Sequence, residues 1–395
     1  MFSTRLPTSL TPNRLSERLA DKRRQGREIL DLTESNPTRV GLVNYGEGWL
    51  GPLGNPAVFA YDPHPRGWRE AREAVARYYR ERGQGEISPD AIHLTASSSE
   101  AYAFLFKLLA DQGESVLVPR PSYPLFEWLA ALEGVELIPY PLEYLPTSGW
   151  RIDLEALRRA ITPRVRAVIV VSPNNPTGSF LREEERVELM AIGERYELAI
   201  IADEVFGDYG WGEDPTRVST LVEETDALTF VLSGLSKVLA LPQMKLGWIV
   251  TAGPPKLAAA ARERLDLIAD TYLSVGTPVQ AAARPWLARR RLIQSPIQER
   301  LQTNLHELVG QIAAAPKAAS RLFRVDGGWS APIEIPRYHT DEEWALLLLE
   351  EDDLLVHPGY FFDFPHEGVL VLSLLPEPER FREGVARLLS RIEVG

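Results

Sequence analysis

Short apolar runs alternate with segments of helical periodicity through the middle of the chain. The expected strands are Ile92–Thr95, Ser115–Val118, Val135–Pro139, Ala167–Val171, Leu198–Ala202 and Thr229–Leu232, and the expected helices are Ser99–Ala110, Leu125–Glu133, Leu154–Ala160 and Arg182–Tyr196. Apolar strands separated by helices predict a mostly parallel sheet that is covered on both faces. The pattern therefore indicates an α/β fold.

The flanking parts are less regular. The elements that we expect before the alternation are an arginine-rich helix over Ser16–Arg27, a strand over Ile29–Thr33, an ordered loop over Trp49–Pro65 and a helix over Gly67–Arg82. At 395 residues the chain exceeds one ordinary core, which predicts two domains or one large α/β domain with appendages.

Polar residues follow the expected strands. The segments that come directly after them are ASSSEAY, PRPSYP, SPNNPTG, DEVF and SGLSK. Ligands of parallel sheets gather at the carboxyl ends of the strands. These loops are therefore expected to form one site.

Lys237 is the residue around which this site is organised. It interrupts the apolar run Asp226–Val250 in a chain that has only six lysines. A buried amine without a partner is costly or loses its proton, and an unprotonated amine can form a Schiff base with the aldehyde of pyridoxal phosphate (PLP). The alternative is a lysine whose stem packs while its ammonium reaches water.

Two further loops carry groups that suit such a cofactor. Ser97, Ser98 and Ser99 stand at a strand-to-helix junction, where hydroxyls, free N–H groups and the helix dipole favour a phosphate. The alternative is that one serine simply caps the helix. Tyr123, between two prolines, could stack on a flat ring or could be ordinary core.

Asp203 and Asn175 complete the candidate set. Asp203 ends the run AIIAD, where a carboxylate needs a cation or a donor, and opposite a pyridine nitrogen it would keep that nitrogen protonated. The alternative is a helix or turn cap. Asn175 could donate to the oxygen beside the aldehyde, or the segment NNPTG could be turn chemistry alone.

Composition excludes several classes of protein. The formal charge of −12 argues against nucleic acid or an anionic membrane as partner, and the absence of cysteine excludes disulfides, thiolate metal sites and thiol catalysis. The first 26 residues lack the apolar core of a signal peptide, and no stretch has the length of a membrane span. We expect a cytoplasmic protein without a metal.

The ordered set SSSEA, PSYP, SPNNPTG, ADEV, SGLSK and HPGYF resembles that of the PLP-dependent aminotransferases of fold type I, the class I and II group, over nearly the whole chain. The resemblance implies a three-layer large domain with a mostly parallel sheet and a small α+β domain built from both chain ends. The expected boundaries are 1–45 for the N-terminal arm and part of the small domain, 46–285 for the large PLP-binding domain and 286–395 for the rest of the small domain.

The resemblance also implies a role for each candidate. Lys237 would form the internal aldimine and shuttle protons, Asp203 would pair with the pyridinium, Asn175 would bind the ring hydroxyl and Tyr123 would stack on the ring. Ser98 and Ser99 would bind the phosphate with Ser236 nearby, and Tyr61 would reach across the interface of a homodimer.

Three positions depart from the family pattern. Phe206 stands where a tyrosine usually gives the ring oxygen a second hydrogen bond, and Lys245 replaces an arginine that anchors the phosphate, which keeps the charge and loses the fork geometry. Val371 occupies the position of the arginine that binds the substrate α-carboxylate. Arg39, in the segment SNPTRVG that resembles the loop covering the substrate, is the replacement that we expect.

The function that we predict is transamination between an amino acid and an oxo acid through PLP and pyridoxamine phosphate. A lyase or decarboxylase of the same fold is the alternative that the motifs leave open. A PLP-sensing regulatory domain would need an attached DNA-binding module, for which neither the acidic charge nor the short N-terminal arm leaves room.

Overall fold

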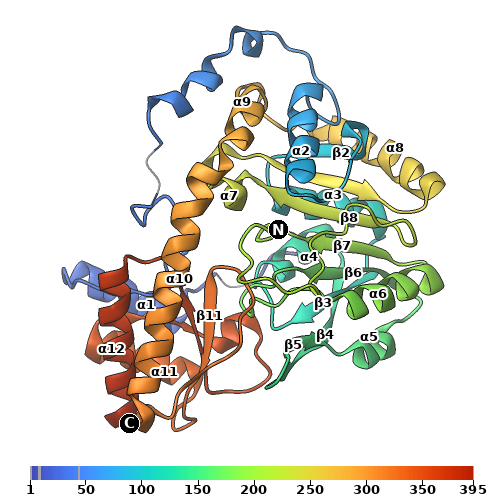
Figure 1. Cartoon of the computed structure of the whole chain (residues 1–395). Coiled ribbons are helices and arrows are strands. Elements are labelled where there is room, and N and C mark those ends of the chain that lie inside the picture. The colour runs from blue at the N-terminus through green and yellow to red at the C-terminus, as the bar shows by residue number, and fades with distance from the viewer. Residues whose placement is uncertain (1, 8–9, 43–44, 395) are drawn as a thin grey trace.

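A sheet of eight strands forms the centre of the larger part of the protein (Figure 1). The computed structural model describes residues 2–7, 10–42 and 45–394, so residues 1, 8–9 and 43–44 of the predicted N-terminal arm lie outside the described part. In spatial order the strands are β2 (Ile92–Thr95), β9 (Gly247–Ala252), β8 (Thr229–Gly234), β7 (Ala199–Asp203), β6 (Val165–Val171), β3 (Ser115–Arg120), β4 (Glu136–Leu145) and β5 (Gly149–Ile152). The strands from β8 to β4 are parallel, whereas β9 is antiparallel to both neighbours and β5 to β4.

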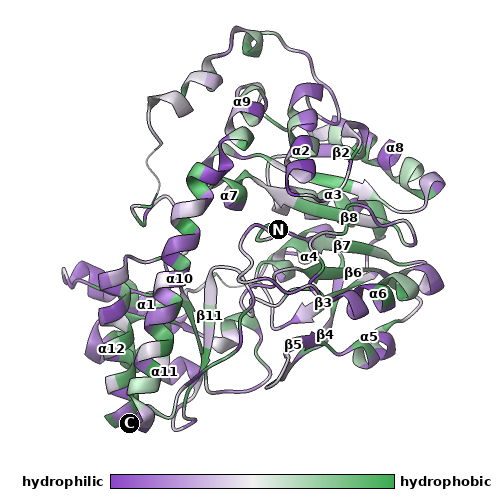
Figure 2. Cartoon of the chain, viewed as in Figure 1, coloured by the Kyte–Doolittle hydropathy of each residue, from purple (hydrophilic) through white to green (hydrophobic). Residues whose placement is uncertain are grey.

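Helices cover both faces of this sheet. Along β6, Val168 and Val170 belong to one apolar core, whereas Ala167 and Ile169 belong to the other, as the alternation of side chains along a strand requires. The first core also contains residues of α2 (Arg69–Glu81), α5 (Leu154–Ala160), α6 (Glu183–Tyr196) and α9 (Thr277–Ala288), and the second those of α3 (Ser98–Leu109), α4 (Phe126–Glu133) and α8 (Pro255–Tyr272). The central strands β7 and β8 are accordingly buried at every position and mainly apolar (Figure 2), and the helices on both faces confirm the predicted three-layer α/β class.

The smaller part contains a second, antiparallel sheet. Its strands in order are β10 (Arg321–Leu322), β11 (Ser330–Glu334), β14 (Val369–Ser373) and β13 (His357–Pro358), and its helices are α1 (Arg14–Arg24), α10 (Arg290–Ala314), α11 (Asp341–Asp352) and α12 (Pro378–Val394). β1 (Leu30–Asp31) pairs in parallel with β12 (Leu354–Leu355), so residues near the start of the chain join the C-terminal part. The numerical boundaries at 45 and 285 stay a prediction.

Most predicted elements are present with shifted ends. Ile92–Thr95 and Leu154–Ala160 have the predicted bounds, whereas the helix expected over Ser16–Arg27 begins at Arg14, because the side chain of Asn13 accepts a hydrogen bond from the amide of Ser16 and caps it there. β5 and β9 were not predicted. The segment expected as an ordered loop contains the short 3-10 helices η1 (Glu47–Trp49), η2 (Gly51–Gly54) and η3 (Pro56–Phe59).

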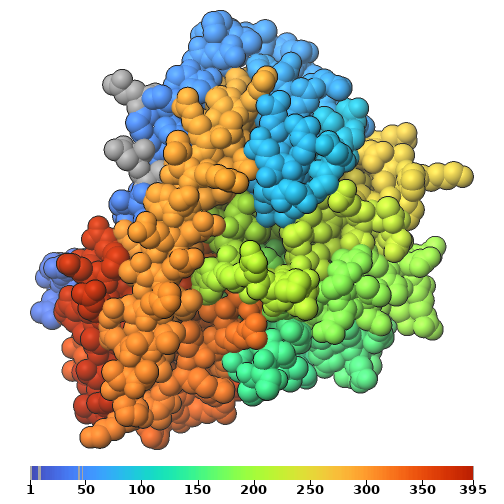
Figure 3. Space-filling model, viewed as in Figure 1, coloured from blue at the N-terminus to red at the C-terminus, as the bar shows by residue number. Residues whose placement is uncertain are grey.

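The long helix α10 joins the two parts across the outer surface (Figure 3). A cleft of about 710 Å³ opens beside it, lined by Arg82 at the end of α2, Asp208 and Arg217 of the segment after β7, and Gln294 of α10 itself. Among the described residues, no helix is both long enough and apolar enough to cross a membrane.

Candidate active site

Lys237 lies in α7 (Leu235–Val238), a helix of four residues directly after β8. Its Nζ atom is 5.0 Å from the centre of the Phe206 ring and 4.6 Å from the centre of the Trp329 ring. Burial lowers the pKa of this amine from 10.5 to about 8, and the negative charge of Asp203 only partly opposes the change. A fraction of Lys237 therefore carries an unprotonated amine near neutral pH.

Three side chains from distant segments hold the C-terminal end of α7. Their hydrogen bonds run from Tyr209 Oη to Lys237 O (2.8 Å), from Gln294 Nε2 to Val238 O (3.0 Å), and from Tyr45 Oη, which is shared between Leu239 O (2.7 Å) and Ala240 O (2.8 Å). The last carbonyl groups of a helix have no partner within it, and a helix this short satisfies few of its own. The main chain that carries Lys237 is thus fixed from outside its own helix.

Asp203 is the last residue of β7, the strand next to β8, and its exposed fraction is 8%. Its Oδ2 atom accepts a hydrogen bond of 3.0 Å from Tyr102, and its Oδ1 atom accepts one of 3.1 Å from the amide of Val205. Burial raises the pKa of the carboxyl to about 6, although both hydrogen bonds and the charge of Lys237 lower it. The hydrogen bond from Val205 is the turn cap that was considered as the alternative role of Asp203. It occupies only one of the two carboxylate oxygens.

Tyr102 was not among the predicted site residues. It stands in the quoted segment ASSSEAY, one turn after Ser98 in α3, and 2% of it is exposed. The available signal was a hydroxyl on the apolar face of a helix that begins beside the site.

Ser97 caps α3, since its Oγ atom accepts a hydrogen bond of 3.1 Å from the amide of Glu100. The capping alternative therefore holds for Ser97 alone. Ser98 and Ser99 lie half-buried in the first turn, and their side chains form no hydrogen bond with any residue that the structure describes. Their role in binding a phosphate stays a prediction.

Asn174 and Asn175 divide the two functions considered for the segment SPNNPTG. Oδ1 of Asn174 accepts hydrogen bonds from Thr177 N (3.3 Å) and Thr177 Oγ1 (2.9 Å), so Asn174 supplies the turn chemistry. Oδ1 of Asn175 instead accepts a hydrogen bond of 3.2 Å from Oγ of Ser330, the first residue of β11. This contact leaves the N–H donors of the Asn175 amide for another acceptor.

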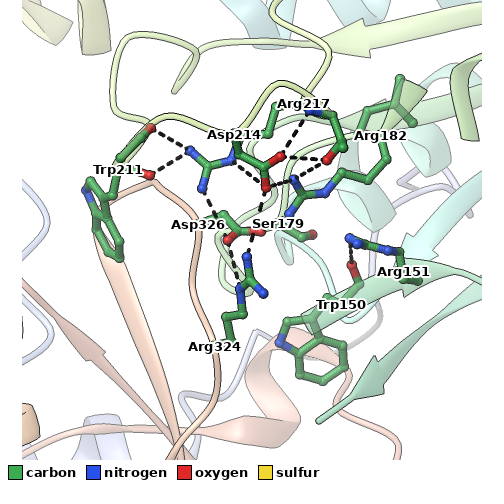
Figure 4. Close-up of polar contacts among 12 residues, drawn as sticks. Trp150, Arg151, Ser179, Arg182, Trp211, Asp214, Arg217, Arg324 and Asp326 are labelled. Carbon is green, nitrogen blue, oxygen red and sulfur yellow. Dashed lines mark hydrogen bonds and ion pairs between the residues drawn. The ribbon is translucent and has the colours of Figure 1, made fainter. Parts of the chain in front are cut away.

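The segment that carries Trp329 and Ser330 is held by a buried ion-pair network (Figure 4). Asp326 forms ion pairs with Arg182, with Arg217 at 3.3 Å and with Arg324 at 3.2 Å. The main chain then passes Gly178, where an added Cβ atom would lie 2.4 Å from the carbonyl oxygen of Gly327. The ion pairs of Asp326 and the close backbone contact between Gly178 and Gly327 together fix the position of Trp329 beside Lys237.

The side chains of the other predicted residues form no hydrogen bond with this group in the described structure. Tyr123 is 44% exposed, and partial burial together with the charge of Asp203 raises the pKa of its hydroxyl. Ser236 is half-buried beside Lys237, whereas Lys245 and Arg39 are exposed and their side chains form no hydrogen bond or ion pair within the described ranges. Tyr61 is 81% exposed, after η3.

Two departures from the family pattern are visible in the geometry. Phe206 packs its ring 5.3 Å from that of Trp329 and carries no hydroxyl, while the nearby hydroxyl of Tyr209 binds the main chain of Lys237 instead. Val371 lies in the middle of β14, 2% exposed, opposite Pro332 of β11 and His357 of β13. No charged group stands at that position.

The chain is similar to known proteins over most of its length. The family model described as aminotransferase class I and II matches residues 59–388. The chain is 27% identical over 381 residues to the glutamate-pyruvate aminotransferase of Escherichia coli, covering 93% of this chain and 91% of that protein, and 27% identical over 368 residues to the alanine aminotransferase of Mycobacterium tuberculosis, covering 85% and 83%. In structure it is similar to the alanine aminotransferase of Pyrococcus furiosus, with a TM-score of 0.89, 23% identity and coverage of 100% of both chains.

Proposed function

The chain belongs to the class I and II aminotransferases and is an amino-acid transaminase, and on this premise we propose that it works with PLP bound to Lys237. When bound, PLP supplies an aldehyde that exchanges with amino groups and a protonated ring that withdraws electrons. The observation that carries the proposal is the amine of Lys237, whose pKa is lowered to about 8 and which stands one strand away from the buried carboxylate of Asp203.

The donors and acceptors of the site suit this cofactor. An amine that loses its proton near neutral pH can bind an aldehyde carbon. The amide of Asn175 has N–H donors left for a ring oxygen, because Ser330 occupies its Oδ1. The first turn of α3 offers hydroxyls and N–H groups for a phosphate. We propose that Ser98, Ser99, Ser236 and Lys245 bind that phosphate and that Tyr123 stacks on the ring.

Lys237, Asp203, Trp329 and Phe206 then have defined tasks. Lys237 Nζ would hold the cofactor and, once released, would take a proton from the substrate Cα and deliver it to the former aldehyde carbon of the cofactor, as transfer of the amino group requires. Asp203 would hold a proton on the ring nitrogen through its carboxylate. The rings of Trp329 and Phe206 flank the amine and limit the access of water to it.

The substrates that we propose are an amino acid and an oxo acid, as the names of the relatives suggest for those proteins. Ser373 donates a hydrogen bond of 2.7 Å to the carbonyl oxygen of Glu34, and residues two apart on a strand share a face. Val371 therefore faces the side on which Glu34 lies, directly before the segment SNPTRVG that contains Arg39. This placement supports Arg39 as the anchor of the substrate carboxylate.

We further propose a homodimer in which Tyr61 reaches the phosphate of the neighbouring subunit. Phe59 and Tyr61 expose 92% and 81% of their area, which suits a surface that a second copy covers. We propose that the predicted boundaries at residues 45 and 285 separate the small and large domains, and that the protein is cytoplasmic, on the ground of composition alone.

Two measurements test the proposal. Borohydride reduction of the PLP-loaded protein followed by peptide mapping should place the pyridoxyl group on Lys237, and a label on Lys245 or Lys107 would contradict it. Incubation with a panel of amino acids should convert the cofactor absorbance to that of pyridoxamine phosphate. Release of ammonia or CO₂ with no such conversion would identify a lyase or a decarboxylase instead.

A further inference from the structure

Tyr102 is buried against the one carboxylate that the proposed function requires to be ionised. We propose that Tyr102 is a positioning residue for transamination: its hydroxyl keeps Asp203 ionised and in one orientation, and thereby keeps the proton on the ring nitrogen of the cofactor. The proposal rests on the proposed function, since it assigns a task at the same site.

The position of the hydroxyl is strongly constrained. The Tyr102 ring packs 5.2 Å from that of Phe126 and 5.9 Å from that of Phe106, centre to centre, and 2% of the residue is exposed. The hydroxyl lies at the end of this apolar slot and reaches Oδ2 of Asp203 at 3.0 Å. A tyrosine hydroxyl in such a place can donate to the carboxylate without competition from water.

Asp203 depends on its few donors. Its oxygens accept one hydrogen bond each within the described structure, from Tyr102 and from the amide of Val205. Burial alone raises the pKa of Asp203, and the hydrogen bond from Tyr102 acts in the opposite direction. The same burial and the charge of Asp203 raise the pKa of Tyr102 well above 10, so the phenol keeps its proton and remains a donor.

A proton shared between Asp203 and a ring nitrogen lies on the weaker acid of the two. A donor on the carboxylate makes the carboxyl a stronger acid, so the proton stays on nitrogen. Without the Tyr102 hydroxyl the proton moves toward Oδ2 of Asp203, and the ring loses its positive charge. α3 would then serve the cofactor twice, through its first turn and through Tyr102 one turn later.

The test compares Tyr102→Phe with Tyr78→Phe. Tyr78 is a matched control, because it is also 2% exposed and donates a hydrogen bond of 2.9 Å to a carboxylate, that of Asp208. Each protein is loaded with PLP labelled with ¹⁵N in the ring, and the chemical shift of that nitrogen is followed from pH 6 to pH 9. Turnover and the dissociation constant of PLP are measured in parallel.

In Tyr102→Phe the ring nitrogen should carry the shared proton in a smaller fraction of molecules, so its chemical shift at the acidic end of the pH range should move toward that of an unprotonated ring nitrogen, as expected for a lost hydrogen bond to a charged group. Turnover should fall with it. Tyr78→Phe should titrate like the unmodified enzyme. An unshifted nitrogen in Tyr102→Phe, or equal shifts in both variants, would overturn the proposal.

A second variant covers the case in which Tyr102→Phe does not fold. Incorporation of 3-fluorotyrosine at position 102 leaves the shape nearly unchanged and makes the phenol a stronger donor, so the shared proton should lie further toward the ring nitrogen and its chemical shift should move toward that of the protonated ring. The ¹³C carboxyl resonance of Asp203 in the cofactor-free protein gives a readout without PLP: its pKa should rise in Tyr102→Phe and fall with fluorotyrosine. Failure of PLP to bind Lys237 would defeat the proposed function, whereas an unmoved Asp203 would defeat only the role of Tyr102.

Discussion

The hydroxyl of Tyr209 donates a hydrogen bond of 2.8 Å to the main-chain carbonyl oxygen of Lys237. The ring of the same tyrosine packs 5.1 Å from that of Trp329, which in turn lies against the Lys237 amine. One side chain therefore fixes both the backbone of the lysine and the aromatic wall that shields its Nζ atom.

Tyr209→Phe should separate these two effects, because the ring remains and the hydrogen bond is lost. A buried carbonyl without a partner costs about 1–3 kcal/mol, so urea denaturation should show a loss of that size. Turnover should fall while the borohydride label still forms on Lys237. Unchanged stability and turnover would mean that the Gln294 and Tyr45 contacts suffice.

Lys237→Met should stabilise the cofactor-free protein at neutral pH. Burial lowers the pKa of Lys237 to about 8 in the folded chain, against 10.5 for the ordinary group. Between these values the unfolded chain binds more protons than the folded one, so the unfolding free energy of the unmodified protein rises with pH relative to the variant. The advantage of the variant should be about 3 kcal/mol near pH 7 and should vanish above pH 10.5. A constant difference across this range would contradict the lowered pKa.

Asp203→Asn should reduce turnover by several powers of ten, since one charged group in a desolvated site is worth about 3 kcal/mol or more. Glu204→Gln is the matched control: Glu204 is the adjacent buried carboxyl, its pKa is raised to about 7, and its Oε1 atom accepts from the amide of Leu221. The control should retain most activity. Near-normal turnover in Asp203→Asn would refute the assigned role.

Arg39→Ala should raise the KM for amino acids by about 10-fold to 150-fold, which corresponds to a lost hydrogen bond to a charged group of about 1.5–3 kcal/mol. The affinity for PLP should stay unchanged. Arg23→Ala removes an exposed arginine of α1 and should leave KM as it was. If Arg39→Ala is silent and amines without a carboxylate react as well as amino acids, the anchor must be sought elsewhere.

Mixed dimers test whether Tyr61 serves the neighbouring subunit. Lys237→Ala and Tyr61→Ala should each be weakly active as homodimers. After the two are unfolded and refolded together, each mixed dimer should contain one intact site, which restores about a quarter of the normal sites in a random mixture. No recovery, together with an active monomer in sedimentation, would place Tyr61 in the site of its own chain.

The sequence predicted those parts of the fold that depend on local pattern. Apolar strands alternating with helices sufficed for the α/β class, and the rule that ligands lie at the carboxyl ends of strands grouped Lys237 and Asp203 into one candidate site. β9 could not be found in this way. It pairs with β8, which precedes it in the chain, and also with β2, and the pairing with β2 joins segments that are far apart in the sequence.

Contacts between distant segments were also beyond the sequence. Ser330 and Asn175 are 155 residues apart, and Tyr102 and Asp203 are 101 apart. A hydroxyl on the apolar face of a helix, as in ASSSEAY, does not by itself distinguish a tyrosine that binds a carboxylate from one that fills the core, because the difference lies in what the other strands bring opposite it. For the same reason, the sequence did not show whether the segment NNPTG binds the cofactor or only forms a turn.

The partners that hold the end of α7 come from positions 45, 209 and 294, so they span most of the length of the chain. Contacts between residues so far apart in the sequence form late in folding, because long loops must close before these contacts lower the free energy. We expect cofactor attachment to follow, and not to guide, the assembly of the central sheet. During refolding with PLP present, the circular dichroism signal of the main chain should recover before the absorbance of the attached cofactor appears. A ribosome-bound chain that has not yet exposed Gln294 should accordingly remain unlabelled by the cofactor.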